Sequence, residues 1–177
     1  NGEGGHAVGI TSLALMAFMS KAHFPGFGQY GAQLDRGMKW LLKEAKERPD
    51  GYLGTVMYEH GLATLALSEL WGMARDPEDD DAIQKALEKA VDVILRSQNP
   101  GGGWRYQPIP VDADLSVTVS TLQALRAARN VGISVPIRTI EKAERYVKQC
   151  ATRFGFTYQS ATNYSFNDTR ISYALTA

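Results

Sequence analysis

Two kinds of hydrophobic pattern alternate along this chain. Segments of the first kind are apolar on nearly every face at helical spacing and rich in small residues; they cover residues 9–18, 61–70 and 117–126. Segments of the second kind are apolar on one face and densely charged elsewhere; they cover residues 30–46, 79–97 and 136–149. A helix that is apolar all round is buried on every face, whereas an amphipathic helix keeps one face in water. The pattern therefore predicts inner helices alternating with outer helices.

Proline and glycine mark the ends of these segments. Pro77 follows Asp76 at the start of the second outer segment, and Pro136 opens the third. Proline is favoured in the first helical turn, where its missing N–H costs nothing. The stretches 49–51 and 99–102 combine proline with glycine, which breaks a helix. We therefore expect three helical hairpins, followed by the start of a fourth inner helix near Asp168.

The outer segments share a motif that recurs at a fixed spacing. Each copy has a basic residue, a small residue, two variable positions, a bulky residue and an aliphatic residue. The copies are Arg36-Gly37-Met38-Lys39-Trp40-Leu41, Lys89-Ala90-Val91-Asp92-Val93-Ile94 and Lys142-Ala143-Glu144-Arg145-Tyr146-Val147, so the period is 53 residues. A period of this size indicates one supersecondary unit stacked several times. An α/α toroid and an open curved solenoid would both produce it.

This motif resembles the QW motif of squalene and oxidosqualene cyclases and, more broadly, the prenyltransferase/squalene-oxidase repeat. The second copy matches in register at Lys89-Ala90, Ile94, Gln98, Gly102 and Trp104, and departs at Val93, where an aromatic residue is expected. The first and third copies have Ala45 and Ala151 in place of the glutamine. The resemblance spans roughly residues 8–177. It implies an all-α fold, an α/α toroid of inner and outer helix hairpins, seen as an incomplete ring in a single domain over residues 1–177.

The glutamine and tryptophan of the motif have a structural interpretation. Gln98 can both donate and accept, so it is expected to bond backbone groups where the outer helix ends. Trp104 offers a large flat surface to lay over a neighbouring helix end. Neither role requires catalysis.

Composition narrows the choice of partners. The 177 residues carry 19 basic and 19 acidic side chains, a formal net charge of zero, which excludes the basic footprint typical of nucleic-acid binders. The apolar stretch 8–19 is too short to span a bilayer.

The chain lacks an initial Met and stops inside an apolar pattern, so we expect a fragment of a longer protein. An incomplete ring would expose apolar flanks, which predicts self-association through its open ends. The sequence indicates no compartment.

The sharpest candidate for chemistry is Asp112-Ala113-Asp114. Class II terpene cyclases protonate an alkene with the middle acid of an Asp-x-Asp-Asp motif; here the resemblance would assign that role to Asp114, with Asp112 beside it and Leu115 replacing the last acid. The competing interpretation is that Asp114 caps the inner helix that follows. Asp168 repeats this placement 54 residues later, and repetition favours the cap.

Glu59 and His60 form a second candidate at the start of another inner helix. A carboxylate beside an imidazole could perform acid–base chemistry. Adjacent helical residues point about 100° apart, so these two cannot act on each other, and a first-turn Glu with a packed His is the favoured interpretation. A glycan-processing site using Glu59 and Asp114 is a more distant alternative.

Other side chains are candidates for ligand contact. The resemblance to cyclases would make Tyr58, Trp71 and Tyr173 cation-stabilising aromatics. Arg105 and Tyr106 lie on a repeated loop at one end of the ring, where solenoids and toroids bind partners, and His60 would join them at a cavity mouth. Two functions remain open: a binding or scaffold toroid for a protein, a peptide or an apolar small molecule, and a terpenoid-cyclase-like enzyme with Asp114 as proton donor.

Metal and cofactor signals are absent from the sequence pattern. His6, His23 and His60 have no metal-ligand spacing, and Cys150 has no Asp-x-Cys context for zinc. The acidic run 79–81 fits a solvated helix start. Gly101-Gly102-Gly103 lacks the Lys-Ser/Thr of a phosphate-binding loop. We therefore expect neither a metal nor a cofactor.

Overall fold

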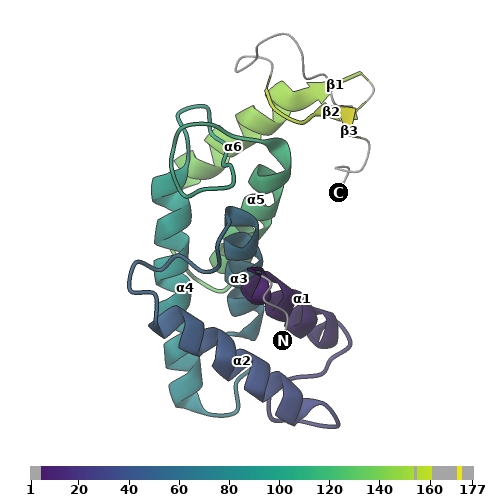
Figure 1. The fold of residues 1–177 in the computed structure, drawn as a ribbon, viewed down its shortest axis with the longest axis vertical. Coiled ribbons are helices and arrows are strands. Elements are labelled where there is room, and N and C mark those ends of the chain that lie inside the picture. The colour runs from purple at the N-terminus through teal and green to yellow at the C-terminus, as the bar shows by residue number, and fades with distance from the viewer. Residues whose placement is uncertain (1–4, 154, 161–170, 173–177) are drawn as a thin grey trace.

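The computed structural model describes residues 5–153, 155–160 and 171–172 and is mostly helical (Figure 1). Its helices are α1 Ala7–Met19, α2 Gly31–Lys46, α3 Met57–Leu70, α4 Pro77–Ser97, α5 Leu115–Asn130 and α6 Ile137–Cys150. Three short strands follow: β1 Ala151–Thr152, β2 Gly155–Thr157 and β3 Ile171–Ser172. The six helices coincide with the segments expected from the hydrophobic pattern, so that prediction is confirmed.

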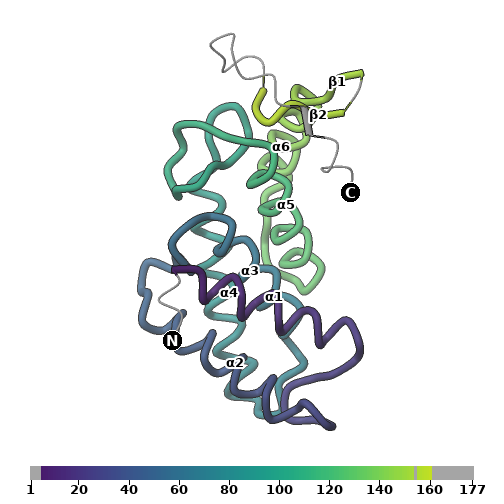
Figure 2. Tube along the Cα trace, turned by 45° about the vertical axis from the view of Figure 1, so that its right-hand side comes forward, coloured from purple at the N-terminus to yellow at the C-terminus, as the bar shows by residue number. Residues whose placement is uncertain are grey.

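The helices form two layers. In one layer α3 packs against α1 on one side and against α5 on the other. In the other layer α2 packs against α4, and each of α2, α4 and α6 also packs against the helix that precedes it in the chain. Three hairpins are therefore stacked side by side in chain order, with the α1–α2 hairpin at one end of the molecule and α6 with the strands at the other (Figures 1 and 2).

Helix α4 shows how the sequence of an outer helix determines where the helix begins and which face it buries. Asp76 precedes its first residue, Pro77, and the acidic residues of its first turn lie at the positive end of the helix dipole. Ile83, Leu87 and Ile94 recur at helical spacing and are fully buried. The charged positions between them face water, so burial of this stripe accounts for most of the stability of the helix.

A tight turn after each of the first two outer helices joins one hairpin to the next. Gly51 has φ +79° and Gly102 has φ +104°, a region that favours glycine. A Cβ on Gly51 would lie 2.8 Å from the carbonyl oxygen of Lys89, and one on Gly102 would lie 2.2 Å from that of Lys142. Both lysines are the first residue of the repeated motif. The repeated motif therefore corresponds to a repeated structural contact, in which the turn after one outer helix lies against the backbone of the next outer helix.

Gln98 and Trp104 hold the turn after α4 in place. The Gln98 amide donates to the carbonyls of Gly102, at 2.8 Å, and Thr139, at 2.9 Å. The Trp104 indole is buried and its Nε1–H donates to the Ile94 carbonyl at 2.8 Å. The expectation that Gln98 bonds backbone where the outer helix ends is confirmed, and Trp104 satisfies a carbonyl of the last helical turn.

The mostly helical structure is consistent with the all-α expectation, to which it adds three short strands. After α6 the chain reverses, as it does after α4, but here the two arms pair as an antiparallel ladder in which Thr152 opposes Gly155. The Thr152 hydroxyl also donates to the Gly155 carbonyl at 2.9 Å. Thr and Phe at these positions favour extended backbone, so the chain reversal forms paired strands rather than a plain turn.

The expectation that inner helices are buried on every face is wrong for α1. Ile10 is 66% exposed and Leu13 is 51% exposed, because one side of α1 has no neighbouring helix in the described chain. Leu65 of α3 and Leu122 of α5 are half-buried. The expected inner helix near Asp168 lies outside the described residues.

Candidate functional site

The N-termini of the inner helices α3 and α5 are each tied to the turn of the next repeat. The first amide of α3, from Met57, donates to the Tyr106 carbonyl at 2.8 Å. The first amide of α5, from Leu115, donates to the Tyr158 carbonyl at 2.8 Å. Amides in the first turn of a helix have no partner within the helix, so these bonds satisfy groups that would otherwise need water. They also bring the two tyrosines to the helix N-termini.

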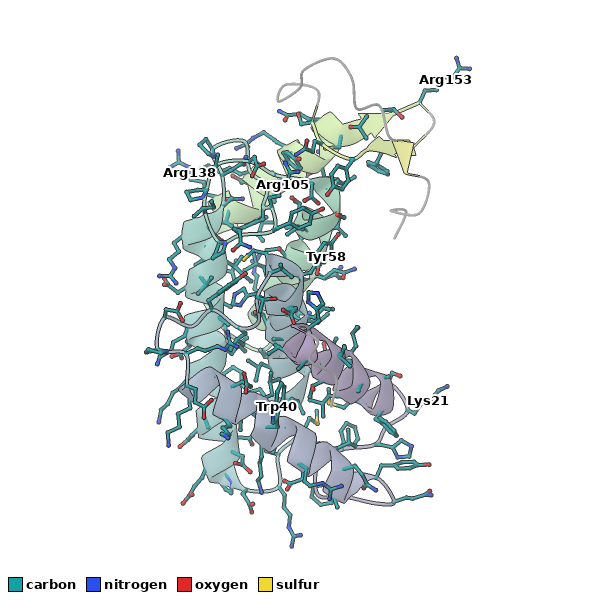
Figure 3. All side chains as sticks on the ribbon, in the orientation of Figure 1. Lys21, Trp40, Tyr58, Arg105, Arg138 and Arg153 are labelled. Atoms are coloured by element: carbon teal, nitrogen blue, oxygen red, sulfur yellow. The ribbon has the colours of Figure 1, made fainter. Side chains whose placement is uncertain are left out.

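The side chains gathered there form what we call the tyrosine rim: Tyr58, Arg105, Tyr106, Asp112 and Tyr158. The Tyr106 and Tyr158 hydroxyls are hydrogen-bonded to each other. The Tyr58 ring lies 6.3 Å from the Tyr106 ring, centroid to centroid. The Arg105 guanidinium carbon stands 5.5 Å from the centre of the Tyr106 ring and one of its nitrogens lies 2.5 Å from Asp112. Figure 3 shows Arg105 toward the end of the molecule that carries α6, with Tyr58 nearer the middle.

Burial and charge shift the proton affinities within the tyrosine rim. Burial lowers the pKa of Arg105, but the hydrogen bond to Asp112 and the negative charges of Asp112 and Asp114 together outweigh that effect, so the pKa lies above its ordinary value. Burial raises the pKa of Tyr58, and burial together with the Tyr106 hydrogen bond raises that of Tyr158. Tyr58 and Tyr158 therefore remain neutral hydroxyls, able to donate and accept, beside a permanent cation.

Asp114 lies next to the tyrosine rim and caps α5. Its Oδ1 accepts from the Val117 amide at 2.9 Å and from the Ser116 hydroxyl at 2.6 Å. The side chain is fully buried, and its Oδ2 has no hydrogen-bond partner in the described chain. The interpretation of Asp114 as a helix cap is confirmed, whereas its role as a proton donor is untested by this geometry.

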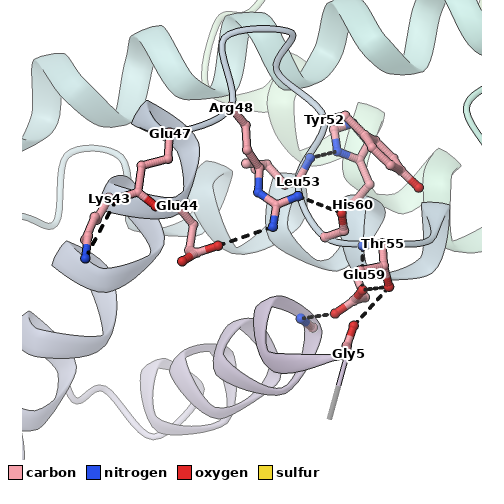
Figure 4. Close-up of polar contacts among 12 residues, drawn as sticks. Gly5, Lys43, Glu44, Glu47, Arg48, Tyr52, Leu53, Thr55, Glu59 and His60 are labelled. Carbon is pink, nitrogen blue, oxygen red and sulfur yellow. Dashed lines mark hydrogen bonds and ion pairs between the residues drawn. The ribbon is translucent and has the colours of Figure 1, made fainter. Parts of the chain in front are cut away.

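Glu59 holds the start of α1 against α3. One oxygen accepts from the Gly9 amide at 3.3 Å, and the other accepts from the Thr55 amide and hydroxyl, both at 2.7 Å (Figure 4). His6 approaches within 3.5 Å. Burial raises the pKa of Glu59, but the bonds from Thr55 and Gly9 outweigh it, so the pKa lies below its ordinary value. Glu59 is therefore an ionised anchor between two inner helices.

His60 is a buried bridge between a turn and an outer helix. Its Nδ1 accepts from the Leu53 amide at 3.0 Å (Figure 4). Its Nε2 lies 3.0 Å from the Ala90 carbonyl and must carry the proton, because a carbonyl only accepts. Burial lowers its pKa to about 4. The packed interpretation of His60 is confirmed, and both ring nitrogens are occupied by backbone.

The structure does not gather all the sequence candidates. Tyr58 and Trp71 stand at opposite ends of α3, and thirteen residues of helical rise separate them by about 20 Å. Trp71 instead borders a hollow with α4 and Ile133. Tyr173 lies outside the described residues. Arg105, Tyr106, Asp112 and Asp114 do come together.

The sequence analysis placed Arg105 and Tyr106 on a binding loop but missed how far this loop extends. Between the turn and the inner helix, residues 105–113 extend much further than the corresponding residues 54–55 before α3. Ile109 and Val111 on this loop are 55% and 73% exposed. Unequal spacing between otherwise equivalent repeats was the signal that could have identified it, since insertions in repeat proteins gather on the binding face.

The described residues offer little else of recognisable chemistry. Within 5–153, 155–160 and 171–172, no three His, Cys, Asp or Glu side chains converge as metal ligands would. Among the described helices, none combines the length and apolar character needed to cross a membrane. Compared with known protein families and with curated proteins, the chain matches none.

Proposed function

We propose that this chain is part of an α/α toroid and that it serves as a binding module, with the tyrosine rim and the adjoining loop as its ligand site. Three stacked hairpins with a 53-residue period support the toroid. The choice of binding over catalysis depends on one observation: the Asp114 carboxylate bonds the first turn of its own helix. A proton-donating acid should instead face a closed apolar cavity.

The ligand that fits this site best is a peptide or a segment of another protein. Tyr106 is 40% exposed, and the Ile109 and Val111 side chains project from the same loop. Tyrosine and arginine are the residues that most often dominate protein–protein contacts. Paired hydroxyls and a guanidinium can bond a peptide backbone, while the two aliphatic side chains supply apolar contact.

A selection from a random peptide library displayed on phage, against the immobilised chain, tests this proposal. Selected peptides should bind Tyr106→Ala about tenfold more weakly than wild type, since loss of a central tyrosine typically costs more than 1 kcal/mol. The backbone bond from Met57 to the Tyr106 carbonyl is unaffected by this change. Lys85→Ala, on the outer helix α4, is the matched control and should bind like wild type. Equal affinity for Tyr106→Ala, or failure to select any peptide, would contradict the proposal.

One observation favours a second candidate, the terpenoid-cyclase-like enzyme. The Oδ2 of Asp114 is buried without a hydrogen-bond partner in the described chain. The Asp114 side chain is also close enough to Tyr58 for its charge to contribute to the raised pKa of that tyrosine. Squalene incubated with the chain would then yield a cyclic product by mass spectrometry. Asp114→Asn should abolish that product and keep the fold, because asparagine also caps helices. Absence of any cyclic product from wild type would remove this candidate.

A further inference from the structure

Helices α2 and α4 enclose a groove of about 490 Å³. The two helices belong to consecutive hairpins and pack directly against each other, so both walls of the groove lie within the described chain. Its floor is formed by four half-buried aliphatic side chains: Leu42, Ala45, Ala82 and Ala86. The groove therefore offers an apolar surface that a ligand could cover.

Exposed lysines form both rims of this groove. Lys39, Lys43 and Lys46 come from α2, and Lys85 and Lys89 come from α4. The chain as a whole has a formal net charge of zero, so this is a local concentration of positive charge. We call the apolar floor and its five lysines the lysine groove.

Carboxylates neutralise the lysine groove only in part. Asp79, the single acidic residue in its lining, lies 3.7 Å from Lys39. Asp35 also approaches Lys39, at 3.1 Å, and Glu47 stands 3.8 Å from Lys43. Within the described part of the chain, the other three lysines take part in no ion pair: Lys46, Lys85 and Lys89.

The spacing of these lysines brings like charges together. Lys39 and Lys43 are related by i, i+4 on α2, and Lys85 and Lys89 have the same spacing on α4. Like charges at this spacing lie on the same side of a helix and destabilise it. A bound anion would remove that repulsion, which is the electrostatic reason to expect one here.

A comparison with the next repeat shows why the groove is open. With the 53-residue period, Ala45 corresponds to Gln98 and Ala86 corresponds to Thr139. The Gln98 amide donates to the Thr139 carbonyl at 2.9 Å and so bridges the end of α4 to α6. Alanine at position 45 cannot make the equivalent bridge, and the space that it leaves is part of the lysine groove.

The next repeat also lacks the concentration of like charge. The counterparts of Lys39 and Lys43 are Asp92 and Arg96, which form an ion pair at 3.9 Å. The counterpart of Lys46 is Asn99. Within the described chain, the open groove and its positive charge thus occur together, between α2 and α4, and neither occurs at the equivalent place between α4 and α6.

We propose that the lysine groove binds an acidic segment of another protein, at a second site formed by other elements than those of the tyrosine rim. Carboxylates along such a segment would pair with the lysines of the two rims, and aliphatic side chains between them would cover the floor around Leu42. Lysine ammonium groups on long flexible stems respond to charge rather than to one fixed geometry. A phosphate group is bound more specifically by guanidinium forks or hydroxyls, and neither lines this groove.

Fluorescence anisotropy with the whole chain tests this proposal. The probe is a short fluorescein-labelled peptide that carries three glutamates for each leucine. It should bind at low ionic strength and be released as salt is raised, because salt screens exposed charges. A thymidine oligonucleotide of equal charge should bind more weakly, since it brings no aliphatic side chain to the floor. Failure of the peptide to bind, or tighter binding of the oligonucleotide, would overturn the proposal.

Charge reversal locates the site. The double variant Lys85→Glu with Lys89→Glu should bind the peptide at least about tenfold more weakly, because like charges would then face each other. Lys21→Glu with Lys148→Glu is the matched control, since it changes the net charge equally at exposed positions outside the groove and should bind like wild type. Circular dichroism would check that both double variants fold. Equal losses of affinity in the two would refute a site at the groove.

Ala45→Gln tests the shape of the groove without changing any charge. The longer side chain would enter the space between α2 and α4, so it should weaken binding of the acidic peptide several-fold while thermal unfolding stays close to wild type. Tyr106→Ala, in the tyrosine rim, should bind this peptide like wild type. Full affinity in Ala45→Gln would contradict the proposal, and a loss of affinity in Tyr106→Ala would move the acidic peptide to the tyrosine rim and overturn it.

Discussion

Acid should destabilise this protein through His60. The imidazole is fully buried, accepts the Leu53 amide at Nδ1 and donates to the Ala90 carbonyl at Nε2. A proton on Nδ1 would break the first bond and leave a buried cation facing a backbone N–H. Folding therefore disfavours the protonated form.

The size of the effect follows from the two proton affinities. The pKa of His60 is about 4 in the folded chain, against an ordinary value of 6.5. Because the pKa is lowered, the stability that His60 contributes is fully present above pH 6.5. It decreases as the pH falls below 6.5 and is lost once the pH passes the folded value. Each pH unit costs about 1.4 kcal/mol, so the total is about 3 kcal/mol.

The assay is urea unfolding followed by circular dichroism, from pH 7 to pH 4, on wild type and His60→Gln. Glutamine can accept and donate a hydrogen bond but does not titrate in this range. Carboxylates such as Glu59 act in both proteins, so their contribution cancels in the difference. Wild type should be the more stable protein at pH 7, and its advantage should shrink by about 3 kcal/mol by pH 4.

An unchanged difference across this pH range would refute the reasoning. So would an NMR titration that places the imidazole of His60 in the folded chain near its ordinary pKa of 6.5. Either result would mean that the ring is solvated or carries a proton on both nitrogens, contrary to the two backbone bonds.

Two further predictions concern stability. Asp114→Ala should lower the free energy of unfolding by about 1 kcal/mol through loss of the cap on Val117, whereas Asp114→Asn should cost less; equal costs in thermal denaturation would argue against the cap. Gly102→Ala should cost about 3 kcal/mol or more, because φ is +104° and the new Cβ would meet the Lys142 carbonyl oxygen. Gly101→Ala, at an exposed neighbouring position without this φ, is its control; its Cβ would lie 3.3 Å from the Asn99 side-chain oxygen, so it should cost much less than Gly102→Ala.

Most of the helical architecture could be predicted because its causes are local. The stripe of Ile83, Leu87 and Ile94 indicates both a helix and its buried face, and Pro77 marks where that helix begins. The cap at Asp114 joins residues three apart, which spacing alone can identify. The short strands after α6 were missed because the same chain reversal can be closed by a turn or by a ladder of paired backbone.

The candidate site was only partly predictable, because its contacts cross large sequence distances. Glu59 bonds an amide fifty residues away, and His60 bonds a carbonyl thirty residues away. No local pattern distinguishes these roles from those of a first-turn Glu and a packed His. Trp71 illustrates the opposite error: as an aromatic residue it resembled Tyr58, yet one helix length separates the two.

The amino-acid sequence alone determined where the helices lie, that they repeat and which of their faces are apolar. These properties depend on residues within a few helical turns of one another. Only the tertiary structure decided which apolar faces are buried. Ala14 and Ala66 occupy the same place in the repeat, yet only Ala66 is buried. Burial belongs to a pair of surfaces, and one helix carries information about only one of them.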